Sequence, residues 1–540
     1  MRDRSSVVAP VARWRAAFLG AFVALLLVKI ALAATLAPFS DEAFYWQESR
    51  HLAWGYSDLP PLTAWLIRLG ETVAGHGLLG MRWPFLLLGA ALPWIVVRFA
   101  REGFDARIGW QAGLLCLALP LAGTLGVLAV PDVPLTVAIM LAVLALQRVA
   151  EANRMRDWLL LGGALALAWM AHYRAAMPML AGLGFFVFAP RGRALWRRRG
   201  LWLALAVASL GLIPLLVSNW QQRGVGIAFQ LVDRNPWRFH ADALAQPLEQ
   251  ALACTPLLYA LLLWAAWQAW RRRQDAPWDV IAFVAVGFLG LYFVLGLFAD
   301  DLRFRAHWPL PGYLPLLAVL PALLWAGQGT RAGRRWLIAA LGLAVAGQVL
   351  GLTYLAAAAT PGGATRLAGL KAFPYAFVGW REAAARASSL RTGGAVLVAD
   401  NFVLAAELDF ALDGDRPGDS RPVYSLDSPL NIKHGRAPQL AIWQRDEAGL
   451  RAAHAGQPML LVVEETAQSE RERLAWQGTL CRRIDAPQAA GRLDLYDGRK
   501  RFAFYRGRVP TVAPSALPAT PAERAACPLW RAAHAAETAP

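Results

Sequence analysis

Apolar runs long enough to cross a lipid bilayer recur along the first two thirds of this chain. The first, Ala16–Leu36, is about as long as a bilayer is thick. It lacks a clear small-residue cleavage site, so we expect it to stay as an anchor. Ten more runs follow: Trp83–Val97, Ile108–Val130, Val133–Leu146, Trp158–Ala171, Ala175–Phe188, Leu201–Val217, Leu252–Trp270, Val280–Phe298, Trp308–Trp325 and Trp336–Tyr354. The series predicts a mainly α polytopic transmembrane bundle of about eleven spans.

The overall composition agrees with a membrane protein. Of the 540 residues 57% are hydrophobic and 17% charged, which is too apolar for an ordinary water-soluble enzyme of this length. The net charge of +17 could suggest nucleic acid, but the basic residues are nearly all arginines in short clusters between apolar runs. That pattern indicates membrane topology, and we expect membrane lipids and no nucleic acid among the partners.

The arginine clusters fall in every second loop between the apolar runs. They comprise Arg2/Arg4/Arg13/Arg15, Arg98/Arg101/Arg107, Arg148/Arg154/Arg156, Arg191/Arg193/Arg197/Arg198/Arg199, Arg271/Arg272/Arg273 and Arg331/Arg334/Arg335. By the positive-inside rule these loops are cytoplasmic. The pattern therefore predicts an inner-membrane protein with a cytoplasmic N-terminus and a periplasmic segment after Tyr354.

After Tyr354 the pattern becomes that of a soluble domain. Short β-branched runs at Ala395–Val398 and Met459–Val463 are separated by helix-like segments at Gly379–Leu390 and Phe402–Leu412. We predict a transmembrane domain over residues 1–357, a small C-terminal α/β domain over 358–508 and a disordered Ala/Pro-rich tail over 509–540.

The outer segment contains two of the four cysteines, Cys481 and Cys527. A disulfide is permitted in the periplasm, but the spacing leaves open whether these two residues pair.

Ionisable residues gather in the loops on the predicted outer face, where polar groups that are not simple anchors tend to mark a working site. Asp41 and Glu42 follow the first span, and Asp132 lies in the second outward turn. The third turn is His172-Tyr173-Arg174, and the fifth outward loop ends at His307. All of these loops are expected to open on the same side of the membrane.

The first outward loop carries a recognisable pattern. It reads SDEAFYW from Ser40 to Trp46 and YSDLPPL from Tyr56 to Leu62. In order, spacing and membrane position this resembles the bacterial branch of the dolichyl-phosphate-mannose protein mannosyltransferase family, which includes lipid A aminoarabinose transferase and the rhizobial galacturonosyltransferases. Further similar segments are Pro131–Leu135, Asn219–Trp220, Phe229–Gln230, His307–Tyr313, Gly379–Glu382 and Ala405–Leu408. The resemblance runs from about Ala16 to Trp443.

The resemblance implies a C-type glycosyltransferase fold and a polyprenyl-phosphate sugar donor. A carboxylate that removes the proton of an acceptor hydroxyl is useful in that reaction, and Asp41 is our candidate for this general base. Glu42 would orient the acceptor or tune its neighbour, and Asp132 would approach from the second loop unless it only caps the following span. The sequence leaves open whether Asp41, Glu42 and Asp132 raise one another's pKa or hold a divalent cation.

The leaving lipid phosphate needs fixed positive partners, since negative charge develops on it. Arg174, Arg303 and Arg305 are the candidates, with His172 and His307 nearby, although Arg303 and Arg305 could equally bind lipid headgroups. Further substrate-binding candidates are Tyr45, Tyr56, Asp58 and Tyr173. The chain departs from its relatives at His172, where a Lys is common, at Leu59, where His or Lys is common, and at His307, which replaces Asn.

The sequence therefore predicts a periplasmic-face glycosyltransferase of the hexosyl or pentosyl type. Its acceptor could be lipid A, a polysaccharide or a protein, and the donor sugar stays open. A lipid-linked sugar transporter or flippase is the main alternative, but the charges gather in outward loops and no inverted repeat is visible. A catalytically inactive glycolipid-binding relative is the third reading. Lys29, inside the first span, is expected to snorkel to an interface, with a substrate role as the alternative.

Overall fold

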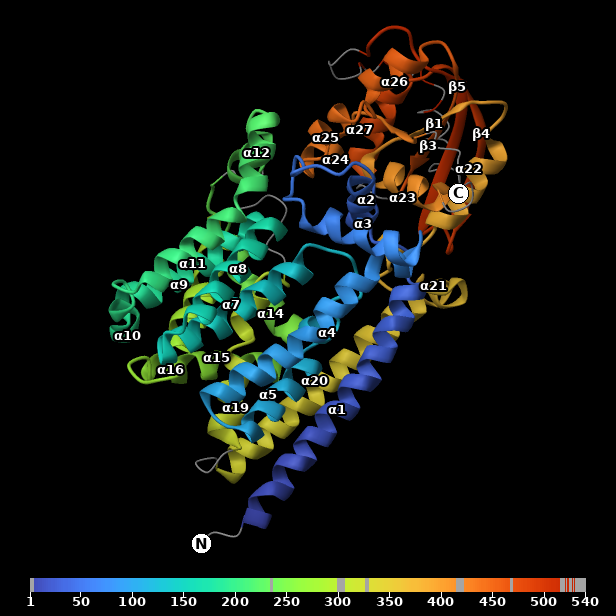
Figure 1. Ribbon diagram of the computed structural model, residues 1–540. Helices are drawn as coiled ribbons and strands as arrows, with labels where there is room; N and C mark the ends of the chain where they lie inside the picture. Colours follow the sequence, from blue (N-terminus) through green and yellow to red (C-terminus); the bar gives the residue numbers. More distant parts are fainter. Residues whose placement is uncertain are drawn as a thin grey trace. The chain divides into compact units, whose positions relative to one another are not determined.

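The structure is a computed structural model that describes residues 4–233, 237–298, 306–325, 330–413, 422–466, 470–514, 520, 522–523, 527 and 529. The chain divides into two compact units (Figure 1). The first comprises Met1–Ala34, Leu52–Gly75 and Leu79–Leu355, and the second comprises Thr35–His51, His76–Leu78 and Ala356–Pro540. The second unit thus includes the segment directly after the first apolar run.

All regular secondary structure described in the first unit is helical. Its α-helices are α1 (Arg4–Thr35), α3 (Leu62–Ala74), α4 (Leu78–Gly103), α5 (Ala106–Ala118), α6 (Pro120–Gly123), α7 (Asp132–Ala152), α8 (Met155–Ala171), α9 (Ala176–Phe188), α10 (Pro190–Ala194), α11 (Arg199–Leu210), α12 (Ile213–Gln221), α13 (Val225–Ala228), α14 (Gln246–Cys254), α15 (Pro256–Arg271), α16 (Trp278–Ile281), α17 (Gly287–Phe298), α18 (Leu310–Tyr313), α19 (Leu316–Leu324) and α20 (Arg331–Ala358). Short 3₁₀ or π segments are η1 (Tyr173–Ala175), η2 (Phe229–Asp233), η3 (Ala241–Ala245) and η4 (Ala282–Val286).

Each predicted span overlaps at least one helix, but fewer of them are single long helices than the eleven expected. Among the described residues, six are long and apolar enough to cross a membrane: Val11–Thr35, Leu78–Gly103, Asp132–Ala152, Arg199–Gln221, Trp278–Phe298 and Arg331–Ala358. A seventh is a pair, Ala241–Cys254 and Pro256–Arg271, bent by 114°. Helix α9 has 13 residues, which at about 1.5 Å per residue is too short for a bilayer core of about 30 Å.

Proline explains why one predicted span is interrupted. The run Ile108–Val130 was expected to be continuous, but α5 ends at Ala118 because Pro120 follows. Leu119, directly before this proline, has extended backbone angles (φ −65°, ψ 114°). Proline lacks an N–H and disfavours helical geometry in the preceding residue, so an apolar composition cannot keep the helix straight here.

Lys29 does not snorkel to an interface. Its side chain is buried in the first unit, and its ammonium donates a hydrogen bond of 2.5 Å to the Leu125 carbonyl oxygen. The loop that provides this carbonyl is brought against α1 by tertiary packing, which the sequence pattern did not indicate. The expectation for Lys29 is therefore wrong.

The second unit is an α/β domain. Its strands are β1 (Val396–Ala399), β2 (Tyr424–Ser425), β3 (Pro458–Glu464), β4 (Asp485–Leu495) and β5 (Lys500–Arg508). Its helices are α2 (Ser40–Arg50), α21 (Pro361–Leu367), α22 (Trp380–Leu390), α23 (Phe402–Asp413), α24 (Pro429–Lys433), α25 (Ala437–Ile442), α26 (Glu447–His454) and α27 (Glu470–Leu480), with a 3₁₀ turn η5 (Tyr375–Phe377).

The five strands form one sheet in the order β2-β1-β3-β5-β4. Strands β2, β1 and β3 are parallel, whereas β5 is antiparallel to both β3 and β4. Alternate residues of a strand point to opposite faces. Accordingly, Val398 and Leu461 pack on one face with α26 and α27 residues, and Leu397 and Leu460 pack on the other face with α22 and α23 residues. The two cores hold the sheet between helical layers.

These observations confirm the predicted fold class, a helical membrane bundle with a small α/β domain. The predicted strands and the helices at 379–390 and 402–412 coincide with β1, β3, α22 and α23. Cys481 and Cys527 form a disulfide, which answers the question that their spacing left open. Most of the predicted tail, 509–540, lies outside the described residues.

Candidate functional site

Asp132 is the first residue of α7, and the residue before it, Pro131, provides no side-chain cap. The Asp132 carboxylate instead contacts two basic side chains from other parts of the first unit. Its Oδ1 accepts a hydrogen bond of 2.6 Å from Arg174 and lies 3.3 Å from Nε2 of His307. The turns that precede α7, α9 and α18 therefore meet at this carboxylate.

Arg174 is positioned by its surroundings on several sides. His172 directly follows α8, and its Nδ1 accepts a hydrogen bond of 3.0 Å from the backbone N–H of Arg174. The guanidinium lies 5.1 Å from the ring centre of Trp308, a favourable cation–π geometry. Its Nε–H is buried and has no hydrogen-bond acceptor among the described residues. A buried donor of this kind is costly unless something accepts from it.

The first unit also contains an apolar cavity of about 430 Å³. It is lined by residues of α7, α8, α9 and α11, and every lining side chain is aliphatic, aromatic or otherwise apolar. Along α9 the lining extends from Ala176 to Phe186, which is about 15 Å at 1.5 Å per residue. The α9 part of the lining thus begins two residues after Arg174 in the chain, and the cavity is a hydrocarbon-like path between helices.

The Tyr56–Pro61 turn is held by the α12–α13 region of the same unit. The Tyr56 N–H donates to the Leu59 carbonyl oxygen at 2.9 Å, and the Gln230 side chain donates to the Asp58 carbonyl oxygen at 2.8 Å. Asn219 donates to the Tyr173 hydroxyl oxygen at 3.2 Å. Asp58 therefore contributes through its backbone to a shaped turn, and its side chain is buried.

Asp41 lies in the second unit, in the first turn of α2. Its Oδ1 accepts a hydrogen bond of 3.3 Å from Arg436, whose other terminal nitrogen lies 3.6 Å from Glu48. The Arg436 side chain is only 4% exposed, whereas that of Asp41 is 33% exposed. Arg436 thus anchors Asp41 from the buried side and leaves part of the carboxylate accessible.

The other two candidates on α2 are turned into the unit. Glu42 is fully buried, and its Oε2 accepts a hydrogen bond of 3.0 Å from the backbone N–H of Phe39. This satisfies a donor at the start of the helix, as in a capping box. Tyr45 is buried, with its ring centre 5.1 Å from the Arg436 guanidinium.

The structure therefore divides the sequence candidates into groups. Asp132, His172, Arg174 and His307 come together, Tyr56, Asp58 and Tyr173 belong to the neighbouring loop network, and Asp41, Glu42 and Tyr45 belong to the second unit. Arg303 and Arg305 lie outside the described residues. No group of three or more His, Cys, Asp and Glu side chains that could hold a metal ion occurs in the described part of the chain.

Arg436 is the residue that sequence reasoning missed. In the sequence it ends the run Lys433-His434-Gly435-Arg436, which has the composition of a solvated basic loop. Nothing local distinguishes this arginine from the others, because its burial arises only when the turn between α24 and α25 folds against α2.

Comparison with known proteins agrees with this architecture. Residues 58–218 match the family described as dolichyl-phosphate-mannose-protein mannosyltransferase. This match includes Asp132 and Arg174 but begins after Asp41. Lipid A galacturonosyltransferase RgtD from Rhizobium johnstonii is 25% identical over 286 residues, which cover 51% of this chain and 58% of the relative. The matched segment thus spans a little over half the length of that relative.

Two solved structures share the fold over nearly the whole chain. ArnT from Cupriavidus metallidurans in the apo state has a TM-score of 0.63 at 16% identity, covering 91% of this chain and 98% of that protein. The same protein bound to undecaprenyl phosphate has a TM-score of 0.61 at 16% identity, covering 93% and 99%. The fold implied by the motifs is confirmed by these two structures, and the family match over residues 58–218 agrees with the resemblance that the motifs indicate.

Proposed function

We propose that this protein is an inner-membrane glycosyltransferase that moves a sugar from a polyprenyl phosphate to an acceptor at the periplasmic face. Undecaprenyl phosphate is bound by the structural relative ArnT, and lipid A is the acceptor named for RgtD. We therefore choose an undecaprenyl-type carrier as the donor lipid and lipid A as the first acceptor to test. Whether the sugar is a hexose or a pentose is left to experiment.

One observation carries this proposal. Arg174, with its buried Nε–H donor, precedes by two residues in the chain the first α9 residue that lines the apolar cavity. A phosphate supplies acceptor oxygens that arginine binds well, and a prenyl chain supplies apolar surface for the cavity. A polyprenyl phosphate combines both features in one molecule.

The ion pair with Arg174 changes the role that we propose for Asp132. A carboxylate already bound by Arg174 and His307 is poorly placed to remove a proton from an acceptor. It is well suited to hold both basic side chains in a fixed direction. We therefore propose Asp132 as a positioning residue for the phosphate-binding groups.

The proposed reaction is a direct displacement at the anomeric carbon. Asp41 accepts the proton of the acceptor hydroxyl while the hydroxyl oxygen forms a bond to that carbon. The bond between the anomeric carbon and the phosphate oxygen breaks, and polyprenyl phosphate leaves with both electrons. Arg174 and His307 stabilise the negative charge that develops on the leaving phosphate.

Replacing Asp41 with asparagine tests the proposal. We expect transfer from a polyprenyl-phosphate sugar to fall by about 10²-fold or more, since a positioned general base contributes roughly 10²–10⁴. Product formation is measured by mass spectrometry of lipid A incubated with purified enzyme and donor. Asp485→Asn, at an exposed aspartate of the same unit, is the matched control.

Unchanged activity of Asp41→Asn would remove the base assignment. Sugar that crosses the membrane of wild-type vesicles without forming a glycosidic bond would instead support the transporter alternative. No transfer and no transport by the wild-type protein would favour an inactive glycolipid-binding relative.

A further inference from the structure

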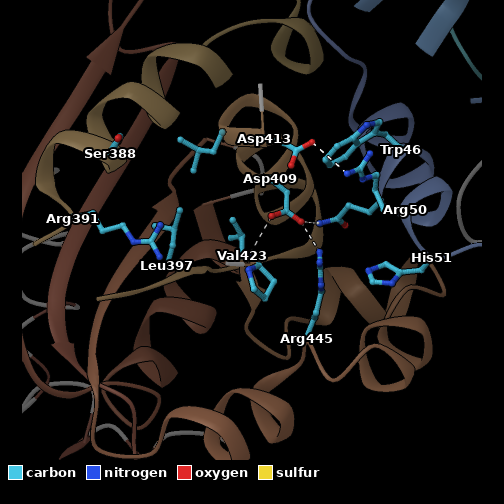
Figure 2. Close-up of a pocket in the computed structure, with 13 residues that line it drawn as sticks. Trp46, Arg50, His51, Ser388, Arg391, Leu397, Asp409, Asp413, Val423 and Arg445 are labelled. Carbon is cyan, nitrogen blue, oxygen red and sulfur yellow. Dashed lines mark hydrogen bonds and ion pairs between the residues drawn. The ribbon is translucent and has the colours of Figure 1, made fainter. Parts of the chain in front are cut away.

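The second unit contains a polar cavity separate from the groups discussed so far. Its volume is about 250 Å³, roughly that of eight water molecules at about 30 Å³ each. It is lined by the C-terminal half of α2, the end of α22, the end of α23 and the loops before β2 and after α25 (Figure 2). A space of this size accommodates one sugar residue.

Charged side chains from separate segments converge on this cavity. Arg50, Arg391 and Arg445 line it together with Asp409 and Asp413, so arginine outnumbers aspartate on its wall. In the view of Figure 2, Arg391 lies on the opposite side of the cavity from Arg50. A ligand between them would meet the Arg391 guanidinium on one side and the Arg50–Asp413 pair on the other.

The two aspartates are already neutralised by the protein. Asp409 accepts hydrogen bonds from Gln47 at 2.7 Å, from Arg445 at 2.5 Å and from the Val423 N–H at 3.1 Å. Asp413 lies 3.8 Å from Arg50 and 3.9 Å from His76. Both carboxylates are therefore paired with basic side chains of the protein. With three arginines against two aspartates, the lining carries a net positive charge.

His51 adds a group suited to sugar hydroxyls. Its side chain also lines the cavity, and burial together with the charge of Arg445 lowers its pKa below the ordinary value. The imidazole is therefore neutral at pH 7 and can both donate and accept a hydrogen bond. Arginine, an amide and neutral histidine around a sugar-sized space are groups that bind an acidic sugar.

Helix α2 carries both Asp41 and residues that line the cavity. Arg50 follows Asp41 by about nine residues in α2, so the two are about 13 Å apart along the helix axis at 1.5 Å per residue. That distance is longer than one sugar residue, so the reacting hydroxyl and the bound anionic sugar would belong to different residues of one glycan. A glycan whose hydroxyl is placed at Asp41 can therefore extend to this cavity.

We propose that this cavity binds an anionic sugar residue, carboxylated or phosphorylated, of the acceptor. The assignment to the acceptor rests on the proposed function, whereas binding of the acidic sugar does not. The site would select acceptors that carry a negative charge at a fixed distance from the hydroxyl that reacts.

Binding is tested by calorimetry on the full-length protein in detergent micelles, with galacturonate, glucose 6-phosphate, glucose and inorganic phosphate as separate probes. We expect galacturonate or glucose 6-phosphate to bind at least about tenfold more tightly than glucose, because the ionised group forms charge-assisted hydrogen bonds. Arg391→Gln should weaken this binding about tenfold. Arg381→Gln, at an exposed arginine of helix α22, which Arg391 directly follows, is the control and should bind as wild type.

Ser388→Phe provides a second variant that keeps every charge but fills the cavity, and it should weaken binding of both acidic sugars. Three results would overturn the proposal: glucose binds as tightly as the acidic sugars, inorganic phosphate binds as tightly as glucose 6-phosphate, or Arg391→Gln binds like wild type. In the transfer assay, Arg391→Gln should raise the KM for acceptor more than it lowers kcat. Because the calorimetry needs no donor, its outcome is separate from that of Asp41→Asn.

Discussion

Arg436 is a buried charged residue that stabilises the second unit through its contacts. Its guanidinium lies between Asp41 and Glu48 and 4.4 Å from the ring centre of Phe44. Two carboxylates and an aromatic face stabilise the cation where water is largely excluded. The same contacts fix the start of α2, so Arg436 couples the stability of the unit to the direction of Asp41.

Replacing Arg436 with methionine should destabilise the second unit by about 3–5 kcal/mol. The substitution leaves the buried Glu48 carboxylate without this positive partner, and an uncompensated buried charge is strongly unfavourable. The free energy of unfolding is measured by urea titration of the full-length protein in micelles, with pulse proteolysis as the readout. Arg381→Met, at an exposed position, should change it by less than about 0.5 kcal/mol. A loss below about 1 kcal/mol for Arg436→Met would contradict the anchoring role.

Asp400 predicts a pH dependence. It is buried directly after β1, and burial, with the nearby Glu464 charge as a smaller cause, raises its pKa well above the ordinary value. A carboxyl group with a raised pKa favours the folded state at low pH, and this contribution is lost as pH rises above about 4. Asn is always neutral, so Asp400→Asn should gain stability relative to wild type with rising pH, by up to about 1.4 kcal/mol per pH unit.

The measurement for Asp400→Asn is the same urea titration at several pH values from about 4 to 8. Asp494→Asn, at a side chain that is 53% exposed, serves as the matched control. A difference between Asp400→Asn and wild type that does not vary with pH would show that the Asp400 carboxyl has an ordinary pKa.

At the scale of elements, the arrangement of α7, α8, α9 and α11 creates the apolar cavity. Gly182 of α9 lines it, and a Cβ built on this glycine meets no atom within 4 Å. A side chain added here therefore enters the cavity without displacing protein atoms. The position offers a way to fill the proposed path of the prenyl chain without altering any charged residue.

We expect Gly182→Leu to raise the KM for the polyprenyl donor roughly tenfold, equivalent to about 1.4 kcal/mol of lost binding. Gly163→Leu is the matched control, since its Cβ also meets no atom within 4 Å but the residue does not line the cavity. Initial rates at varied donor concentration provide the test. Equal KM values for the two variants would place the donor lipid elsewhere.

The local sequence pattern predicted the type of secondary structure more accurately than it predicted where each element begins and ends. The strands β1 and β3 and the helices α22 and α23 were expected because hydrophobic periodicity is a property of neighbouring residues. The break after α5 and the bend between α14 and α15 depend on prolines within apolar runs. Composition averaged over a run conceals such single-residue effects.

For the whole molecule, the disulfide Cys481–Cys527 reports on membrane orientation. The positive-inside rule predicts that the second unit is periplasmic, where thiols become oxidised. The other two cysteines, Cys116 and Cys254, are buried in the first unit. The oxidation state of the pair therefore distinguishes the two orientations.

In denatured protein from intact cells trapped with acid, we expect a maleimide polymer to label two cysteines before reduction and four after it. A cytoplasmic second unit would keep its thiols reduced, and all four cysteines would react without reductant. Cys481→Ser should leave Cys527 reactive and should lower the stability of the second unit by about 2–5 kcal/mol.

The sequence by itself determined that this chain is a helical membrane protein with an α/β domain, because the length of an apolar run and its periodicity are properties of consecutive residues. The motifs also identified Asp41, Asp132 and Arg174 as candidates. Only the tertiary structure decided their partners: Arg174 reaches Asp132 from another helix, and Arg436 reaches Asp41 from nearly 400 residues away in the chain (separation 395). Which side chains meet depends on how loops pack, and that information is spread over segments that no local pattern joins.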